Sequence, residues 1–304
     1  MASFSTSLFV IIPPMPSTFR RPVSNSMYFS SGHPLIRRRG FQVTGATTAV
    51  NLESHKKHDE ALDNLFSCPI CYEPLIRKGP AGLNLPAVYR SGFKCKKCVI
   101  PFTSKDGYLD LTITSNATVY NEFKPARTEL FRSPVVSFLY ERGWRQNFWS
   151  SGFPGLDEEF KMAQEYFKPV AGGVLVDVSC GSGLFSRKFG ASGTYSAVIA
   201  LDFSESMLRQ CIEYIKQETS PLTMNIAVVR ADVSRLPFSS GSIDAVHAGA
   251  AIHCWPSPSN AVAEISRILK SGGIFVATTF LATALNSPFS FEQLRQLRLQ
   301  GSYI

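Results

Sequence analysis

The chain has 304 residues, a hydrophobic fraction of 44% and a formal net charge of +8 at pH 7. This length is enough for one catalytic domain with a smaller module and an extension, and it argues against one small compact domain. No apolar run reaches the roughly 20 residues that a membrane-spanning helix needs. We therefore expect a protein that is not embedded in a membrane.

The N-terminal segment has the composition of a targeting peptide. The first 52 residues contain many Ser, five Arg and no Asp or Glu, which is typical of an organelle transit peptide. A secretory signal would place basic residues before its apolar core, whereas the apolar run 8–12 has none before it. The opening Met-Ala-Ser favours a plastid. We predict that residues 1–52 are a disordered plastid transit peptide that is removed, leaving a charge of only +3 and little support for nucleic-acid binding.

Four of the seven cysteines form two close pairs. Cys68 and Cys71 flank Pro-Ile, Cys95 and Cys98 flank Lys-Lys, and 23 residues separate the pairs. This spacing is typical of a metal site and not of a disulfide framework. Four thiolates can close a tetrahedral zinc site and leave no open position for catalysis. The sequence predicts a zinc-ribbon-like module at residues 65–111 with a structural zinc ion; free or redox-active cysteines are the alternative.

Alternating helices and strands follow the cysteine module. Residues 129–154 are rich in aromatic side chains and predict a helical bridge packed on the main domain. Phe160, Ala163 and Phe167 then share one helical face. Five apolar strands are predicted at 174–178, 197–201, 226–230, 243–248 and 274–279, separated by helices that begin near Ser204 and Ser259, the second of which ends at 272–273. This pattern predicts an α/β fold with a parallel sheet covered on both faces.

A turn of small residues follows the first of these strands. Asp177 ends the strand, and Ser179, Gly181 and Gly183 then allow a backbone to approach a ligand closely. Asp202 ends the second strand 25 residues later, where a carboxylate can accept both hydroxyls of a ribose. Asp232 ends the third strand beside Val233, a suitable place to meet an adenine ring and its amino group, although a helix N-cap is the alternative role for Asp232.

These segments resemble the successive motifs of class I S-adenosylmethionine (SAM)-dependent methyltransferases. The run 230–238, Arg-Ala-Asp-Val-Ser-Arg-Leu-Pro-Phe, is similar to the type 11 group, which includes ubiquinone and menaquinone biosynthesis enzymes. The resemblance implies a Rossmann-like sheet with SAM as cofactor. It places Gly181 and Gly183 at the methionine part of SAM, Asp202 at the ribose, Phe203 and Met207 around the adenine, and Asp232 at the adenine amine. One position departs from the family, which usually has Gly where this chain has Ser179.

The cysteine module suggests two kinds of acceptor. A zinc ribbon before a type 11 core is similar to bacterial rRNA guanine methyltransferases, in which the ribbon helps to hold RNA, and Lys94, Lys96 and Lys97 could touch phosphate. Three lysines on such a loop are more often a solvated face. The order of transit peptide, cysteine module, aromatic bridge and core more closely resembles plant plastid methyltransferases that associate with plastoglobules, the lipid bodies of the plastid.

Methyl transfer from a sulfonium requires alignment more than a fixed catalytic motif, because the donor is already activated. If the acceptor must lose a proton, a base is needed near the carboxyl end of the sheet. His253 and His247 are weak candidates for that role, and structural roles are the alternative for both. Trp255 and the aromatic bridge could line an apolar acceptor pocket, although core packing explains them equally well.

The predicted methyltransferase domain spans residues 156–304. Its C-terminal end is shorter than the family pattern. A complete class I core has seven strands, and the sequence predicts five, followed by a helix at 291–299 with Ser290 and Gln293 as a capping box. We expect a C-terminally truncated sheet whose fifth strand is an exposed apolar edge.

Three functions therefore compete. The first is a plastid methyltransferase for a small lipophilic acceptor such as a quinone or another prenyl lipid. The second is an RNA methyltransferase, and the third is a non-catalytic SAM-fold or zinc-binding interaction protein.

Overall fold

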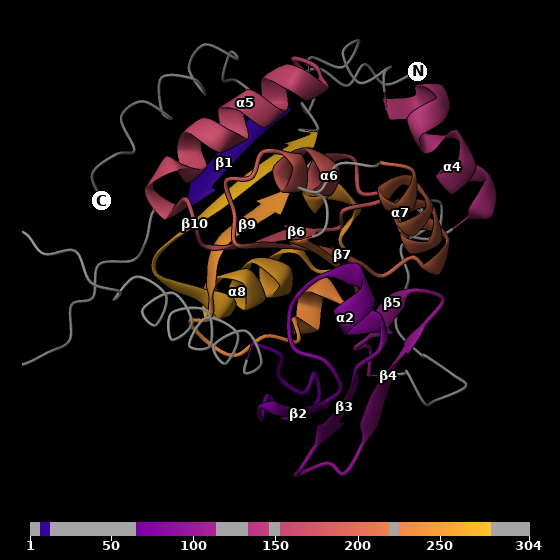
Figure 1. Ribbon diagram of the computed structural model, residues 1–304. Coiled ribbons are helices and arrows are strands. Elements are labelled where there is room, and N and C mark those ends of the chain that lie inside the picture. Colours follow the sequence, from indigo (N-terminus) through magenta and orange to yellow (C-terminus); the bar gives the residue numbers. More distant parts are fainter. Residues whose placement is uncertain (1–6, 13–64, 114–132, 146–152, 219–224, 281–304) are drawn as a thin grey trace, which may run out of the picture.

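A computed structural model describes residues 7–12, 65–113, 133–145, 153–218 and 225–280. Its strands form one ten-stranded sheet in the order β1-β10-β9-β6-β7-β8-β5-β4-β3-β2. Helices cover both faces of the central strands (Figure 1). Within the described residues, no helix is both long and apolar enough to cross a membrane.

Five parallel strands form the centre of this sheet, as predicted. They are β6 (Val174–Val178), β7 (Ala197–Asp202), β8 (Ile226–Arg230), β9 (Ile243–Ala248) and β10 (Leu269–Phe280). Strand β6 pairs with both β7 and β9, so the chain turns from one side of β6 to the other after β8. Ligands of open α/β sheets bind outside the carboxyl ends of the strands at such a switch point.

The helices α5 (Leu156–Phe167), α6 (Leu184–Ala191) and α7 (Glu205–Gln217) cover one face of the sheet, and α8 (Pro258–Ile268) covers the other. Ser204 caps α7, as predicted, because its hydroxyl accepts from the Met207 N–H at 3.4 Å. The prediction for α8 was less accurate. Pro258 occupies the first turn, so the helix begins after Ser257 and not at Ser259, and it ends at Ile268, before the two glycines.

The cysteine module extends the same sheet. It contains β2 (Leu75–Lys78), α2 (Leu85–Tyr89), β3 (Gly92–Cys95), β4 (Pro101–Lys105) and β5 (Tyr108–Asp110). Strand β5 pairs in parallel with β8, placing Leu109 beside Val229 and Asp110 beside Arg230. Buried module residues such as Phe66 and Leu109 belong to the same apolar cluster as the α8 face of the sheet. The module therefore shares its core with the main domain.

The edge of β10 that does not face β9 is also paired in the structure. Strand β1 (Ser7–Ile12) runs antiparallel to it, with Ser7 opposite Phe280 and Ile12 opposite Phe275. The expectation of an exposed β10 edge was therefore wrong. Backbone pairing explains the result, because an edge strand offers a row of unpaired N–H and C=O groups. The transit peptide at residues 1–52 stays a prediction. The other residues of the predicted transit peptide and the helix predicted at 291–299 lie outside the described residues.

The described part of the aromatic bridge is helical. It comprises α4 (Pro134–Leu139) and a π-helical turn, η1 (Tyr140–Trp144); Phe131, Phe148 and Trp149 lie outside the described residues. A buried ion pair fixes its end to α5: Arg145 Nη2 lies 2.7 Å from Glu159 Oε1, with side chains 5% and 1% exposed. Burial raises the pKa of Glu159 and the neighbouring Arg145 opposes that rise. The bridge is thus packed on the main domain.

Replacing Arg145 should destabilise the fold strongly. Arg145→Met would leave the Glu159 carboxylate buried without a counter-charge, and we expect a loss of about 3–5 kcal/mol at pH 7 by denaturant unfolding. Without Arg145 the pKa of Glu159 rises further, so protonation at lower pH should reduce the deficit relative to wild type. The double variant Arg145→Met, Glu159→Gln is the control and should lose less than the single variant. An equal deficit at pH 7 and pH 5 would contradict this account.

Candidate functional site

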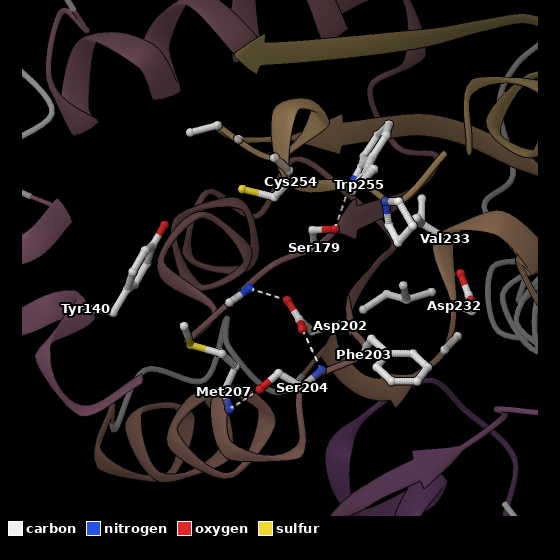
Figure 2. Close-up of a pocket in the computed structure, with 17 residues that line it drawn as sticks. Tyr140, Ser179, Asp202, Phe203, Ser204, Met207, Asp232, Val233, Cys254 and Trp255 are labelled. Carbon is white, nitrogen blue, oxygen red and sulfur yellow. Dashed lines mark hydrogen bonds between the residues drawn. The ribbon is translucent and has the colours of Figure 1, made fainter. Parts of the chain in front are cut away.

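A pocket lies at the carboxyl ends of β6, β7, β8 and β9. Figure 2 shows that Asp202 lies between two ends of this pocket, with Tyr140, Met207 and Cys254 at one end and Phe203, Asp232 and Val233 at the other. Its lining residues are Tyr140, Ser179, Gly181, Leu201, Asp202, Phe203, Ser204, Met207, Ala231, Asp232, Val233, Gly249, Ala250, Ala251, Cys254, Trp255 and Pro256.

Asp202 is held at the end of β7 by backbone donors. Its Oδ2 accepts from the Gly181 N–H at 2.9 Å, and its Oδ1 accepts from the Ser204 N–H at 2.8 Å. Burial raises the pKa of this carboxyl, and the backbone N–H groups oppose the rise. Each oxygen keeps further acceptor capacity. The group is therefore held in a fixed orientation with acceptor positions still open.

The other end of the pocket is a short turn after β8. Asp232 precedes the 3-10 turn η5 (Val233–Arg235) and its Oδ1 accepts from the Ser234 N–H at 2.8 Å. The predicted alternative of a capping role is thus confirmed, and the same residue also lines the pocket. Phe203 and Val233 lie at the same end of the pocket as Asp232, whereas Met207, which the resemblance placed around the adenine with Phe203, lies at the other end.

Ser179 has the backbone conformation of the glycine that it replaces. Its φ is +57°, in the left-handed region that a side chain disfavours. Its hydroxyl accepts from Trp255 Nε1 at 2.9 Å, so the extra side chain forms a bond across the pocket (Figure 2). Trp255 is buried, with 7% of its surface exposed. The departure from the family pattern thus leaves the turn intact and fixes an indole above it.

Two residues predicted as ligand contacts lie behind the pocket instead. The Asp177 carboxylate accepts from Ser186 Oγ at 2.6 Å and contacts His247 Nδ1 at 2.7 Å, and it is not among the lining residues. A Cβ on Gly183 would lie 2.3 Å from Cys211 Sγ, so this glycine allows α6 and α7 to pack closely. Gly181 does line the pocket, and it has room for a Cβ.

Neither candidate histidine lines the pocket. His247 is 2% exposed and packs between the rings of Phe185 and Phe189, with centroid distances of 4.7 and 5.1 Å. The His247 side chain points toward α6, on the face of the sheet opposite to the one that α8 covers. His253 lies next to the pocket wall, where its Nδ1 is 3.2 Å from Thr279 Oγ1. The geometry gives both histidines structural contacts.

Tyr140 closes the pocket from the aromatic bridge, as the aromatic pattern suggested. Burial raises its pKa to about 12. The next residue anchors it, because Glu141 pairs with Arg187 Nη2 at 2.7 Å and also accepts from Ser182 Oγ. The sequence reading missed Cys254 and the loop 249–251. The run Gly-Ala-Ala after a buried strand was an available signal, since small residues permit close approach.

The four predicted metal ligands meet in the structure. The sulfur atoms of Cys68, Cys71, Cys95 and Cys98 all lie within 4.8 Å of one another, and Cys71 and Cys95 are 3.5 Å apart. Tetrahedral zinc with bonds of about 2.3 Å places its sulfur ligands about 3.8 Å apart, so the cluster fits that ion. The Cys98 N–H points to Cys95 Sγ at 3.3 Å, and the Glu73 N–H lowers the pKa of Cys71 to about 7.

Ser179 provides a test of the turn. Ser179→Ala should keep the left-handed strain and leave Trp255 Nε1 without its acceptor, at a cost of about 1–3 kcal/mol in unfolding free energy. Ser179→Gly loses the same bond but removes the strain, so it should be about 1 kcal/mol more stable than Ser179→Ala. Urea unfolding of both variants measures the difference. Equal stabilities would show that the turn is unstrained.

Comparison with known proteins places the chain in a family. A methyltransferase domain model matches residues 176–277. A chloroplastic methyltransferase of Arabidopsis thaliana, named as uncharacterized, is 67% identical over 78% of this chain and 68% of its own length, and a second is 54% identical over 79% and 69%. A demethylmenaquinone methyltransferase of Desulfitobacterium hafniense is 26% identical over 61% of this chain and 64% of its own. The chain belongs to the class I SAM-dependent methyltransferases, beside these plant plastid proteins.

Proposed function

We propose that this protein is a plastid methyltransferase that transfers the methyl group of SAM to a small lipophilic acceptor, with a quinone or another prenyl lipid as the expected class. The observation that carries the proposal is the charge of the pocket. Among the described residues that line it, the charged ones are Asp202 and Asp232, and the remainder are apolar, aromatic or small. Two carboxylates without a cation disfavour an anionic acceptor and suit a neutral one.

SAM fits the donor set of the pocket. Asp202 would accept both ribose hydroxyls, and Asp232 would accept from the adenine amine. Phe203 and Val233 would cover the adenine ring, so we call Phe203, Asp232 and Val233 the adenine end. Gly181 would lie along the methionine part, which leaves Tyr140 and Cys254 beside the methyl group. SAM supplies an activated methyl group on a positively charged sulfur, and the residues around it align the acceptor and exclude water.

The acceptor would enter between the aromatic bridge and the loop after β9. Tyr140, Trp255 and Pro256 provide flat apolar surfaces there, and Ala250 and Ala251 provide room. An aromatic acceptor would stack on such walls. The relative from Desulfitobacterium hafniense is named for a demethylated menaquinone, which supports a quinone-like acceptor. The two Arabidopsis relatives are named chloroplastic, which supports a plastid location. The leader at residues 1–52 and association with plastid lipid bodies are further parts of the proposal.

The four cysteines would hold a structural zinc ion. Their sulfur atoms fit a tetrahedral site, and four protein ligands leave no position for substrate. Zinc would therefore stabilise the module and take no part in methyl transfer.

RNA remains the second candidate acceptor because Lys94, Lys96 and Lys97 are exposed beside the cysteine cluster. One of them, Lys97, has an acidic neighbour, with Nζ 3.8 Å from Glu73 Oε1. The lysines could hold phosphates, but the pocket residues that the structure describes include no cation for a phosphodiester chain.

Asp202 is the sharpest test of the SAM site. Asp202→Asn keeps the size of the side chain but replaces one carboxylate oxygen with a donor, so calorimetric SAM affinity should fall at least about tenfold. Asp157→Asn, on the exposed surface of α5, is the matched control and should bind like wild type. Thermal unfolding with and without SAM checks that each variant is folded. Equal SAM affinities for the two variants would remove Asp202 from the site.

The acceptor can be identified by isotope transfer. The full chain, residues 1–304, would be incubated with methyl-labelled SAM and, separately, plastid lipid extract or plastid RNA. We expect label in the lipid fraction, and Tyr140→Ala should reduce it at least about tenfold because one wall of the proposed acceptor entrance is lost. Label in RNA alone would favour the RNA methyltransferase. Binding of SAM without label in either fraction would favour a non-catalytic interaction protein.

A further inference from the structure

The cysteine cluster and the adenine end of the pocket are joined by one short turn. The loop of Cys68 and Cys71 lies against η5, the turn that begins with the pocket residue Val233. Arg235, the last residue of η5, donates from Nη2 to the Ile70 carbonyl at 3.3 Å. Ile70 stands between the two cysteines in the chain. One arginine therefore connects the backbone of a metal loop to the turn that carries part of the pocket wall.

A second set of contacts fixes the metal loop to the same region. The Tyr72 ring lies under two guanidinium groups, 5.6 Å from Arg235 and 4.4 Å from Arg267. Arg267 also donates to the carbonyls of Leu236 and Phe238 at 2.7 Å each, directly after η5. The Ser67 N–H donates to the Pro237 carbonyl at 2.9 Å. The segment after η5 is thus held between α8 and the metal loop.

The far strand of the module supports the opposite side of the adenine end. Asp110, on β5, lies 3.0 Å from Arg230 Nη1. Arg230 Nε donates to the Phe203 carbonyl at 3.1 Å, and its guanidinium lies 5.1 Å from the Phe203 ring. Phe203 lines the pocket. Both walls of the adenine end are therefore positioned by residues that contact the cysteine module.

The metal would determine whether this support is rigid. Tyr72 follows Cys71 with a φ of +61°, a strained conformation for a side chain of this size. Four bonds from sulfur to one ion would connect the two cysteine pairs and hold the loop of Cys68 and Cys71 in that shape. Free thiols would leave the two pairs without a cross-link. Losing the ion would release Ile70 and Tyr72, and with them the contacts to Arg235.

We propose that metal binding at the four cysteines and SAM binding in the pocket are coupled, and that Arg235 is the positioning residue that connects the two sites. This inference rests on the zinc site and the SAM contacts proposed above. Zinc should raise SAM affinity, and SAM should raise zinc affinity by the same coupling free energy. Coupling between protein sites is commonly five- to 150-fold in affinity, and we expect about five- to twentyfold here.

The test measures SAM affinity in zinc-loaded and chelator-treated protein, kept reduced, by calorimetry. Zinc content is measured separately on each sample. In wild type, removing zinc should weaken SAM binding about five- to twentyfold. Arg235→Met should bind SAM about as weakly as metal-free wild type, and its affinity should change less than twofold on zinc removal. A merely structural role for Arg235 would lower stability and leave the effect of zinc on SAM affinity unchanged.

Arg90→Met is the matched control, because Arg90 is an exposed arginine of the same module at the end of α2. It should keep the full effect of zinc. If the metal-free protein unfolds, the reciprocal measurement remains: zinc transfer to a chromogenic chelator, with and without S-adenosylhomocysteine, in wild type and Arg235→Met. At equilibrium, S-adenosylhomocysteine should reduce the fraction of zinc transferred to the chelator only in wild type.

The outcomes separate the two proposals. Protein purified without zinc, and unable to take it up, would remove the metal site itself. Bound zinc together with a SAM affinity that is indifferent to its removal would overturn the coupling and leave the metal site standing. An Arg235→Met variant that keeps the full effect of zinc would show that Arg235 does not connect the sites.

Discussion

A parallel sheet that is covered on both faces leaves only the ends of its strands free for polar groups. The strands β6, β7, β8 and β9 are buried almost throughout, so a carboxylate on them must either find a partner inside or stand near a strand end. Asp177 takes the first course, in contact with His247 and Ser186. Asp202 and Asp232 take the second and line the pocket. The position of the site follows from this constraint.

The cysteine module is an integral part of the main sheet. The module is not a separately attached domain. Strand β5 continues the sheet beyond β8, and apolar residues of the module belong to the same buried cluster as those of α8. A ribbon attached in this way is well placed to support the pocket wall. An RNA clamp would also require a cationic path from Lys94, Lys96 and Lys97 to the pocket, and the described lining residues provide none.

The sequence was sufficient to predict the central strands, the cap at Ser204 and the four cysteines, because each depends on local pattern or spacing. The sequence was insufficient to predict features that depend on contacts between segments far apart in the chain. Asp177 is the penultimate residue of β6 and Asp202 is the last residue of β7, and only the contact with His247 shows that Asp177 faces away from the pocket. The pairing of β1 with β10 and of β5 with β8 depends on edges that no local pattern marks. Ser179 was recognised as unusual, but its bond to Trp255 joins residues 76 positions apart.

The pairing of β5 with β8 also bears on how the chain folds. Asp110 and Arg230 are 120 positions apart, so the last strand of the module waits for its neighbour until most of the main domain has been synthesised. Contacts of such long range require a large loop to close and slow the search for the native state. An incomplete chain would expose β5 as an unpaired edge, open to association with other chains. A metal ion captured early by the four thiols would fix the hairpins of the module, so β5 would already be in place to pair when β8 arrives.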